Sequence, residues 1–438
     1  MDGGMSMRIS KLFVAGSALA LILASSAAMA GGFQRGTADT DILYEKGTFS
    51  SRFGLSYVNP NRGFSSIEGV ESDSGDYTGI YQIPSGAIAF GNEDAACAGT
   101  FTEAFAADAD YTDTPDGALP AQASAVPGLG GNIDDDQRTN FGAASSVSRT
   151  RSISFNSNEF GLTCRASYTV DYGRFSLLGG IFAEDFQFDG SSLGTTFAGP
   201  GIPFAVATTQ IDVHSEGGYE AGYRIGAAFE KPEIALRVQV LYRSEVEHDD
   251  IKGDGTVTFL SSLVPGLPAG AVVPVDSYLS DATSPQSLTI NAQTGIAEGT
   301  LLLASFRWTD WSSNKSVVSS IRNSAVGIDS SSYSPYNWDD GYTASIGIGR
   351  AFTDEISGIV SIGYDSGVST GSETTYTDLY TLSGGVSLKP NKWSEIRFGG
   401  LIGYWSDGDQ KVSDDAYFNA HVDDTIVYAG NASLKLSF

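Results

Sequence analysis

The last 14 residues of the chain alternate between an apolar and a polar face. A period of two predicts a β-strand, and an apolar outer face over a polar inner face is typical of transmembrane β-barrels. The chain ends on Phe438, and barrel-assembly machinery in outer membranes typically recognises such a terminal aromatic residue. A secreted β-sandwich is the alternative, although it rarely ends on so regular a strand. The apolar face carries Ile426, Tyr428, Gly430, Ala432, Leu434, Leu436 and Phe438.

The first 30 residues have the pattern of an export signal. Arg8 and Lys11 precede an apolar run over 12–24, and Ala28-Met-Ala30 matches the small-x-small cleavage rule. The run has 13 residues, which is too short to span a bilayer comfortably, so an N-terminal anchor helix is the weaker alternative. No later segment reaches the roughly 18 apolar residues of a membrane helix. We therefore predict a signal peptide over 1–30 and an exported chain that is either soluble or a closed barrel.

The composition favours an all-β chain. Of 438 residues, 53 are Gly, 24 are Phe and 20 are Tyr, while only 18% are charged. So many aromatic residues supply ample surface to bury, which argues against disorder. The chain carries 25 basic and 52 acidic residues, and its net charge of −27 argues against a nucleic-acid partner, because polyanions require a basic surface.

The same alternation, followed backwards from the C-terminus, predicts 14 antiparallel strands, an even number as in bacterial single-chain barrels. The links between them alternate without exception between short and long. Short turns belong at the periplasmic end and long loops outside. We therefore expect an integral barrel of the bacterial outer membrane over residues 48–438, with both termini in the periplasm. The predicted strands span 48–59, 77–90, 95–108, 160–169, 174–189, 219–229, 234–251, 287–296, 301–311, 341–352, 356–365, 377–388, 394–405 and 425–438.

One strand in the middle of the chain contains the most specific motif. The block Tyr242-Arg-Ser-Glu-Val246 resembles a signature of the long-chain fatty acid transporters of outer membranes, the FadL and toluene-transporter group. Gly31-Gly-Phe-Gln34 and Thr309-Asp-Trp311 are also similar to that family. The resemblance implies a fourteen-strand barrel that carries hydrophobic molecules inward by passive diffusion. It also implies that ligands enter at the extracellular loops and that an N-terminal hatch blocks the straight path to the periplasm.

The predicted hatch is shorter than the family's. Only 31–47, which is 17 residues, precedes the first strand, and the Asn-Pro-Ala turn of well-known members is missing. Asn59-Pro60 lies at the far end of the first strand and cannot take that role. The resemblance therefore implies an abbreviated plug, in which Phe33 matches the family's N-terminal Phe near the ligand path.

Alternation also assigns side chains to the barrel interior. In strand 234–251 it places Arg237, Gln239, Arg243, Glu245 and Glu247 inside, and Val238, Val240, Tyr242 and Val246 against lipid. It likewise places Arg52, Arg165, Arg224, Arg307 and Arg397 inside. One interpretation is an arginine–carboxylate ladder that braces the lumen. The other is that one or two guanidinium groups hold a fatty-acid carboxylate. The candidate ligand residues are Arg243, Arg237, Glu245, Arg397, Phe33 and Phe182, with the alkyl chain along Leu178, Phe182, Leu241 and Leu401.

Two cysteines lie in neighbouring predicted strands. Cys97 and Cys164 are placed at similar depth on the lipid-facing parity, and export to an oxidising compartment makes a disulfide plausible, with two free thiols as the alternative.

The long links are acidic at Asp134–Asp136, Asp249–Asp250 and Asp423–Asp424. Solvation explains these carboxylates better than bridging cations on lipopolysaccharide, because no calcium-loop spacing is present. The apolar stretch 264–274 could be a lipid entry surface or a site of loop packing.

Catalysis, a metal and a cofactor are not predicted. The three histidines, His214, His248 and His421, lie near loop ends, and the sequence has no Gly-x-Ser-x-Gly elbow, Walker loop or Cys/His metal spacing. Two functional classes remain: a transporter of long-chain fatty acids or similar hydrophobic compounds, and a general or structural porin with a water-filled lumen. Single-channel conductance distinguishes them, because only a porin conducts ions steadily.

Overall fold

The computed structural model describes residues 31–72, 75–114, 117–120, 122–123, 146–199, 202–280, 282–314, 316–373 and 375–438. The predicted signal peptide over 1–30 and the acidic stretch Asp134–Asp136 lie outside the described residues. Within the described part of the chain, no helix is both long and apolar enough to cross a membrane.

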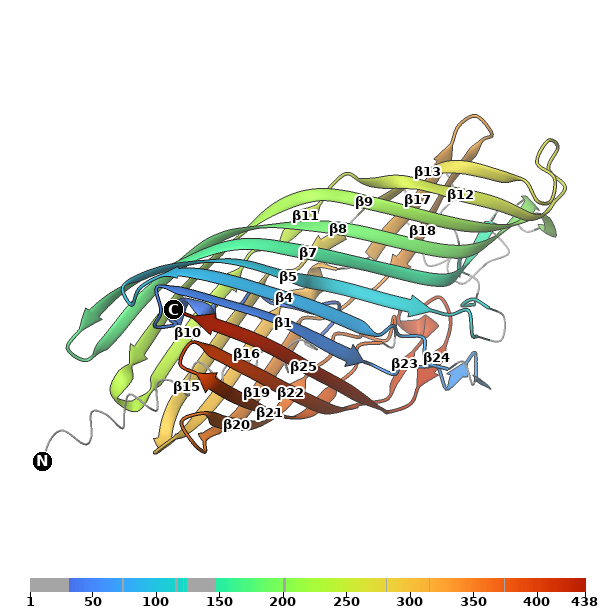
Figure 1. The fold of residues 1–438 in the computed structure, drawn as a ribbon. Coiled ribbons are helices and arrows are strands. Elements are labelled where there is room, and N and C mark those ends of the chain that lie inside the picture. The colour runs from blue at the N-terminus through green and yellow to red at the C-terminus, as the bar shows by residue number, and fades with distance from the viewer. Residues whose placement is uncertain are drawn as a thin grey trace, which may run out of the picture.

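Fourteen antiparallel strands form a closed barrel, as predicted (Figure 1). The last strand pairs with the first, with Ser50 opposite Ser437 and Arg52 opposite Lys435, so the barrel has no free edge. All 14 strands coincide with predicted ones, although several extend further. The barrel strands are β1 (Phe49–Asn59), β4 (Tyr81–Gly91), β5 (Ala95–Asp110), β7 (Ser146–Val170), β8 (Gly173–Gly199), β9 (Ile202–Lys231), β10 (Leu236–Arg243), β15 (Ser287–Ala297), β16 (Thr300–Thr309), β19 (Gly341–Ala351), β20 (Ile356–Asp365), β21 (Leu379–Asn391), β22 (Ser394–Trp405) and β25 (Thr425–Ser437).

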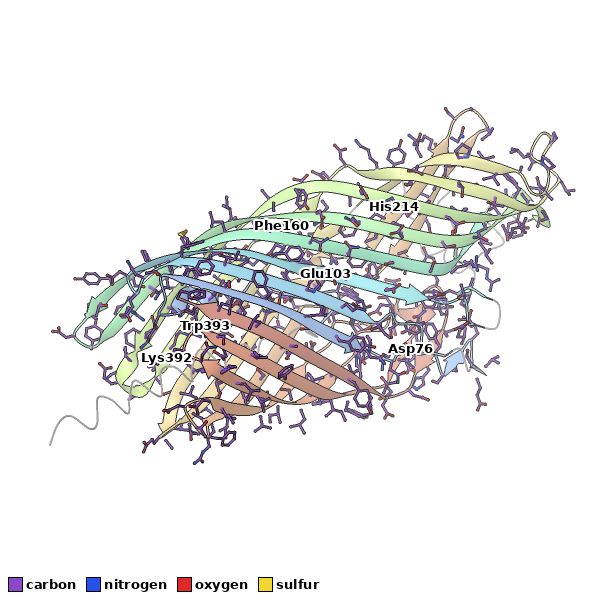
Figure 2. The ribbon with its side chains drawn as sticks, viewed as in Figure 1. Asp76, Glu103, Phe160, His214, Lys392 and Trp393 are labelled. Atoms are coloured by element: carbon purple, nitrogen blue, oxygen red, sulfur yellow. A yellow bond between two sulfur atoms is a disulfide. The ribbon has the colours of Figure 1, made fainter. Side chains whose placement is uncertain are left out.

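The barrel is apolar outside and polar inside, the reverse of a soluble protein. Leu382, Ile402 and Tyr428 are exposed on neighbouring strands, and Phe160 projects from the outer wall in Figure 2. Inward positions of the same wall carry buried polar groups. This inversion is what the hydrocarbon of a membrane requires of a spanning barrel. The buried inward groups include Ser50, Arg52, Thr163, Arg165, Ser361, Ser383, Ser387, Glu395 and Arg397.

Several segments that alternation assigned to long links are strands. β7, β8 and β9 have 25, 27 and 30 residues and continue well beyond the barrel rim (Figure 1). The far part of β9 pairs with β12 (Ile251–Ser262), and the sheet goes on through β13 (Val272–Ser280), β17 (Ser316–Asn323) and β18 (Ile328–Pro335). We call this sheet the outer extension. It was missed because its strands are rich in Ser and Thr and lack the continuous apolar face of a lipid-contacting strand.

The predicted strand 234–251 is wrong in its second half. β10 ends at Arg243, and Ser244 and Glu245 leave the ladder before β11 (Val246–His248) pairs with β14 (Ala282–Ser284). The break inverts the predicted parity. Val246 is buried, whereas Glu245 and Glu247 are exposed, so neither glutamate faces the lumen as predicted.

Smaller elements complete the structure. A four-stranded sheet lies at the long-loop end of the barrel, formed by β2 (Ser66–Ile67), β3 (Val70–Glu71), β23 (Gly408–Gln410) and β24 (Ala420–Val422). β6 (Gln122–Ala123) pairs with β7. The short 3-10 helices are η2 (Asp41–Tyr44), η4 (Pro232–Ile234), η5 (Trp311–Ser313) and η6 (Val412–Asp414). The sulfur atoms of Cys97 and Cys164 are joined as a disulfide across β5 and β7.

Candidate functional site: a plugged lumen with successive cavities

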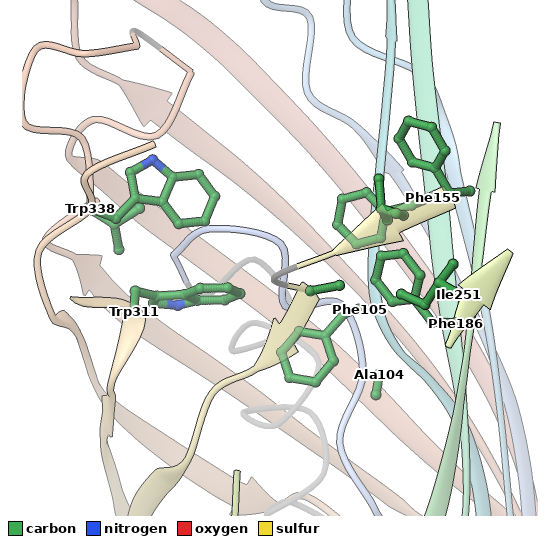
Figure 3. Close-up of a cluster of buried hydrophobic side chains, with 11 residues drawn as sticks. Ala104, Phe105, Phe155, Phe186, Ile251, Trp311 and Trp338 are labelled. Carbon is green, nitrogen blue, oxygen red and sulfur yellow. The ribbon is translucent and has the colours of Figure 1, made fainter. Parts of the chain in front are cut away.

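An aromatic cluster surrounds Phe33 inside the long-loop end of the barrel. The Phe33 ring centroid lies 4.6 Å from that of Phe155 and 4.5 Å from that of Trp338. Figure 3 shows the side chains of Phe155 and Trp338 on opposite sides of this cluster. Phe33 contacts both of them. Tyr376 and Trp311 add edge-to-face contacts at 5.7 and 6.0 Å. Such contacts orient aromatic rings as well as burying them.

The hatch segment, residues 31–47, is held here by backbone and side-chain hydrogen bonds. The Gly31 N–H donates to the carboxylate of Asp365, and the Ala106 N–H donates to the Phe33 carbonyl over 2.9 Å. Gly32 has φ +63°, and a Cβ on it would lie 2.7 Å from Trp311 Cε2. Only glycine fits this close approach.

Arg35 lies at the edge of the aromatic cluster and also lines the lower cavity described below. It donates to the carbonyls of Gly32 and Gln34 and to the Tyr376 hydroxyl, the last over 3.0 Å. Its guanidinium also lies 4.2 Å from the Tyr81 ring centroid, a cation–π contact. Neutral acceptors and an aromatic face therefore fix Arg35 across the lumen.

Three cavities follow one another along the lumen. The aromatic cavity, of about 140 Å³, lies at the long-loop end and is lined by Phe33, Arg35, Tyr81 and Asp365 among others. The lower cavity, of about 150 Å³, lies at mid-barrel between hatch residues 35–41 and β15 and β16. Because Arg35 lines both, the hatch strip 31–36 separates them. The mouth pocket, of about 580 Å³, opens at the short-turn end beside the turn of Lys392 and Trp393, which Figure 2 labels.

The second half of the hatch is fixed by charges and a small apolar core. Asp41 pairs with Arg237 over 2.7 Å, and Glu45 pairs with Lys435 over 2.9 Å. Ile42 and Leu43 are fully buried in the same core as Leu178, with Leu241 packed against it. The predicted alkyl path along Leu178 and Leu241 is therefore covered by the hatch itself.

A buried ionic network surrounds the predicted ligand residue Arg243. Its Nε donates to Glu159 over 3.2 Å, its Nη2 donates to Glu184, and its Nη1 donates to the carbonyls of Ser244 and Pro285. Every guanidinium nitrogen thus has an acceptor. Arg224 also pairs with Glu159, and the His248 Nε2 lies 3.2 Å from Glu184. The geometry therefore makes Arg243 a structural residue, because a ligand carboxylate would have to displace one of the two carboxylates already bound.

The other predicted ligand residues do not form one site, because they lie in different parts of the structure. Phe182 lies between the Arg224 and Arg243 guanidinium groups, each 4.4 Å from its ring centroid. Arg237 pairs with the hatch, and Arg397 pairs with Glu395 over 2.7 Å. The predicted inward position of Glu245 is wrong, since it is exposed beyond the strand break. Phe33 alone of the six lies in the aromatic cavity.

Sequence reasoning missed most of the cavity's aromatic residues. Tyr336, Trp338 and Tyr376 come from long links, where alternation carries no information. The sequence did contain one signal for them, because these aromatic residues lie just before the predicted strands 341–352 and 377–388. The apolar stretch 264–274 also has an observed place: Val264, Leu267 and Ala271 pack against a small core of the outer extension.

A further pocket, of about 360 Å³, lies in the outer extension between β7–β9 and β17–β18 and is lined largely by Ser and Thr with Phe188 and Phe259. Among the described side chains, no cluster of three or more His, Cys, Asp or Glu is placed to hold a metal ion.

Comparison with known proteins shows the fold. No family model matches the chain, and no curated protein matches it. Among solved structures, a FadL homologue of Pseudomonas aeruginosa has a TM-score of 0.65 at 14% identity, with 95% of this chain and 98% of that chain covered. The chain has the fold of the FadL-type barrels.

Two further barrels are similar. The toluene transporter TbuX of Ralstonia pickettii has a TM-score of 0.58 at 15% identity, covering 94% of this chain and 93% of that one. The toluene transporter TodX of Pseudomonas putida has a TM-score of 0.59 at 12% identity, covering 94% and 97%. The hatch of this chain lies within the same type of barrel.

Proposed function

We propose that this protein is an outer-membrane channel for the passive uptake of long-chain fatty acids or similar hydrophobic compounds. The observation that carries the proposal is the aromatic cavity, which Phe33 of the hatch segment lines together with aromatic side chains such as Phe155 and Trp338. An apolar cavity with a few polar groups suits a hydrophobic molecule better than a hydrophilic solute. Two of the similar barrels are described as toluene transporters, which supports the same class of cargo.

The orientation belongs to the same proposal. The short turns would face the periplasm and the outer extension the medium, with both termini periplasmic. A hydrophobic compound would then meet the outer extension first, followed by the aromatic cavity, the lower cavity and the mouth pocket. Outer-membrane lipid and lipopolysaccharide would surround the apolar belt, and the barrel-assembly machinery would recognise the strand ending at Phe438.

A binding measurement tests the cargo directly. Trp311 and Trp338 belong to the core around Phe33, so a brominated fatty acid or a brominated aromatic hydrocarbon in that cavity should quench their fluorescence in the purified barrel. Phe33→Ala should reduce the quenching, whereas Tyr168→Ala, on the outer wall, should leave it unchanged. Equal quenching in the wild type and Phe33→Ala would contradict the proposed site. Growth of a deletion strain on oleate as sole carbon source then separates fatty acids from other cargo.

The alternative function is a general porin. Its ion path would have to cross the hatch strip 31–36, where Arg35 is fixed by four neighbours, Gly32, Gln34, Tyr81 and Tyr376. In planar bilayers we expect little or no steady ion conductance. A large, permanently open conductance would favour the porin.

A further inference from the structure

Arg307 differs from the other inward arginines. It lies on β16 with 7% of its surface exposed, and its Nε donates to Thr289 Oγ1 over 3.0 Å. Its buried Nη1 has no hydrogen-bond partner among the described residues, and no described acidic side chain forms an ion pair with it. Six inward arginines do have carboxylate partners, namely Arg52, Arg165, Arg224, Arg237, Arg243 and Arg397.

The guanidinium of Arg307 lines the lower cavity. Thr289, Asn291 and Ser305 line it beside Arg307, and the Ser305 hydroxyl donates to Asn291 Oδ1 over 2.8 Å. The wall next to Arg307 therefore offers neutral polar groups, and the two acids that line the same cavity, Asp39 and Asp41, are already paired with Arg52 and Arg237.

The aromatic cavity and the lower cavity differ in the charged residues that line them. The aromatic cavity is lined by one arginine and three carboxylates, Asp108, Asp365 and Glu373. The lower cavity is lined by four arginines, Arg35, Arg52, Arg307 and Arg397, and two carboxylates, Asp39 and Asp41. An anionic group is therefore favoured in the lower cavity and disfavoured in the aromatic one, because interactions between charges are strengthened where water is excluded.

Burying a guanidinium without a counter-charge is costly, and an anion that accepts its hydrogen bonds removes that cost. Carboxylates match the planar fork of arginine in bidentate geometry. Arg52 and Arg397 already have acidic partners and Arg35 donates to carbonyls and a hydroxyl. Arg307 instead forms no ion pair with a described acid, donates through Nε to the neutral Thr289 hydroxyl, and keeps a buried Nη1 without an acceptor among the described residues.

We propose that Arg307 is the anion receptor of the lower cavity and binds the carboxylate headgroup of a single-chain amphiphilic acid that has passed the hatch strip. The inference rests on the proposed function and adds a polar binding site to it, separate from the aromatic cavity. Small free carboxylates share the same chemistry, so the test must separate headgroups on alkyl chains from free anions.

Calorimetric titration of the full barrel in a nonionic detergent, with empty micelles as the blank, provides that test. The ligands are laurate, dodecanol and acetate, which separate the charge from the chain. For Arg307→Gln we expect laurate to bind roughly 10- to 100-fold more weakly, the range of a lost charge-assisted hydrogen bond, with dodecanol nearly unchanged. Arg307→Lys, which keeps the charge, should retain part of the laurate affinity.

The matched control is Arg322→Gln, an exposed arginine of the outer extension paired with Asp329, which should change neither ligand. Electrophoretic mobility without boiling confirms that each variant is folded. Laurate binding unaffected by Arg307→Gln while dodecanol still binds would overturn the role of Arg307 and leave the proposed function intact. Failure of both ligands to bind the wild type would overturn both proposals. Acetate binding as tightly as laurate would show that the site holds free anions and would overturn the headgroup assignment.

Discussion

At the scale of single residues, most inward arginines of this barrel lie beside a carboxylate, and Arg307 is an exception. Glu159 and Glu184 are both almost fully buried, and Arg243 pairs with each of them. Removing one member of such a network leaves the opposite charge uncompensated in a medium that solvates it poorly. We therefore expect these buried ion pairs to stabilise the folded barrel and not to bind the transported compound.

Arg243→Ala tests this expectation. Because Glu159 and Glu184 would each lose one cationic partner in a buried network, we expect the free energy of unfolding in urea to fall by about 3–5 kcal/mol. The exposed pair Arg322–Asp329 supplies the control, since Arg322→Ala should change stability by less than about 1 kcal/mol. Unchanged stability of Arg243→Ala together with weaker fatty-acid binding would instead make Arg243 a ligand residue.

Sequence alternation placed Arg243 inside correctly, because Gln239 and Arg243 share the parity of a regular strand. It could not foresee which acids would meet it, since Glu159 and Glu184 come from other strands and their approach depends on the barrel's curvature and register. Glu245 was misplaced because Ser244, at the strand break, bonds to the backbone of Tyr223 on β9 through both its side chain and its amide. No periodic pattern reports such a bond.

At the scale of elements, the hatch depends on one close backbone approach. The Cβ of Gly32→Ala would overlap the Trp311 ring and would also require a strained positive φ. We expect displacement of the first hatch residues and a measurable rise in ion conductance in planar bilayers.

Gly266→Ala separates the two causes, because Gly266 has φ +85° but nothing within 4 Å of its added Cβ. It should leave conductance at the wild-type level. If Gly32→Ala conducts no more than Gly266→Ala, the contact with Trp311 does not hold the plug.

The outer extension contains a titratable contact. On β9, His214 Nδ1 lies 2.8 Å from Asp189 and Nε2 lies 3.1 Å from Glu216. These hydrogen bonds raise the pKa of His214 above its ordinary value. A folded-state pKa above the unfolded one means that the stabilisation is complete below about pH 6.5 and is lost as the pH rises through the raised value.

We therefore expect amides of β8, β9 and β12 near His214 to be better protected from hydrogen exchange at pH 5.5 than at pH 8.5, after correction for intrinsic rates. Amides of β19 and β20 in the same sample are the internal control. His214→Gln should remove the difference, and a difference that persists in this variant would assign it to another group.

At the scale of the whole molecule, the closed barrel could be predicted because lipid imposes a simple rule on every spanning strand. Tyr364, Tyr380 and Tyr404 follow that rule on adjacent strands of the outer wall. Beyond the membrane, strands do not need a continuous apolar face. The outer extension was therefore assigned to loops, although its strands are paired. The aromatic cavity could not be foreseen either, because Trp338 and Tyr376 reach Phe33 from links with no regular spacing.

The proposed function assigns the molecule one task, the passage of hydrophobic compounds through a barrel that the hatch would close to water-soluble ones. The most direct measurement is the initial rate at which whole cells take up a labelled hydrophobic compound, oleate or toluene, in a deletion strain with and without the gene restored. The account predicts a several-fold lower rate in the deletion strain and full recovery on restoration. The account would be contradicted if the deletion strain and the restored strain took up oleate at the same rate and toluene at the same rate, with the folded barrel present in the outer membrane of the restored strain.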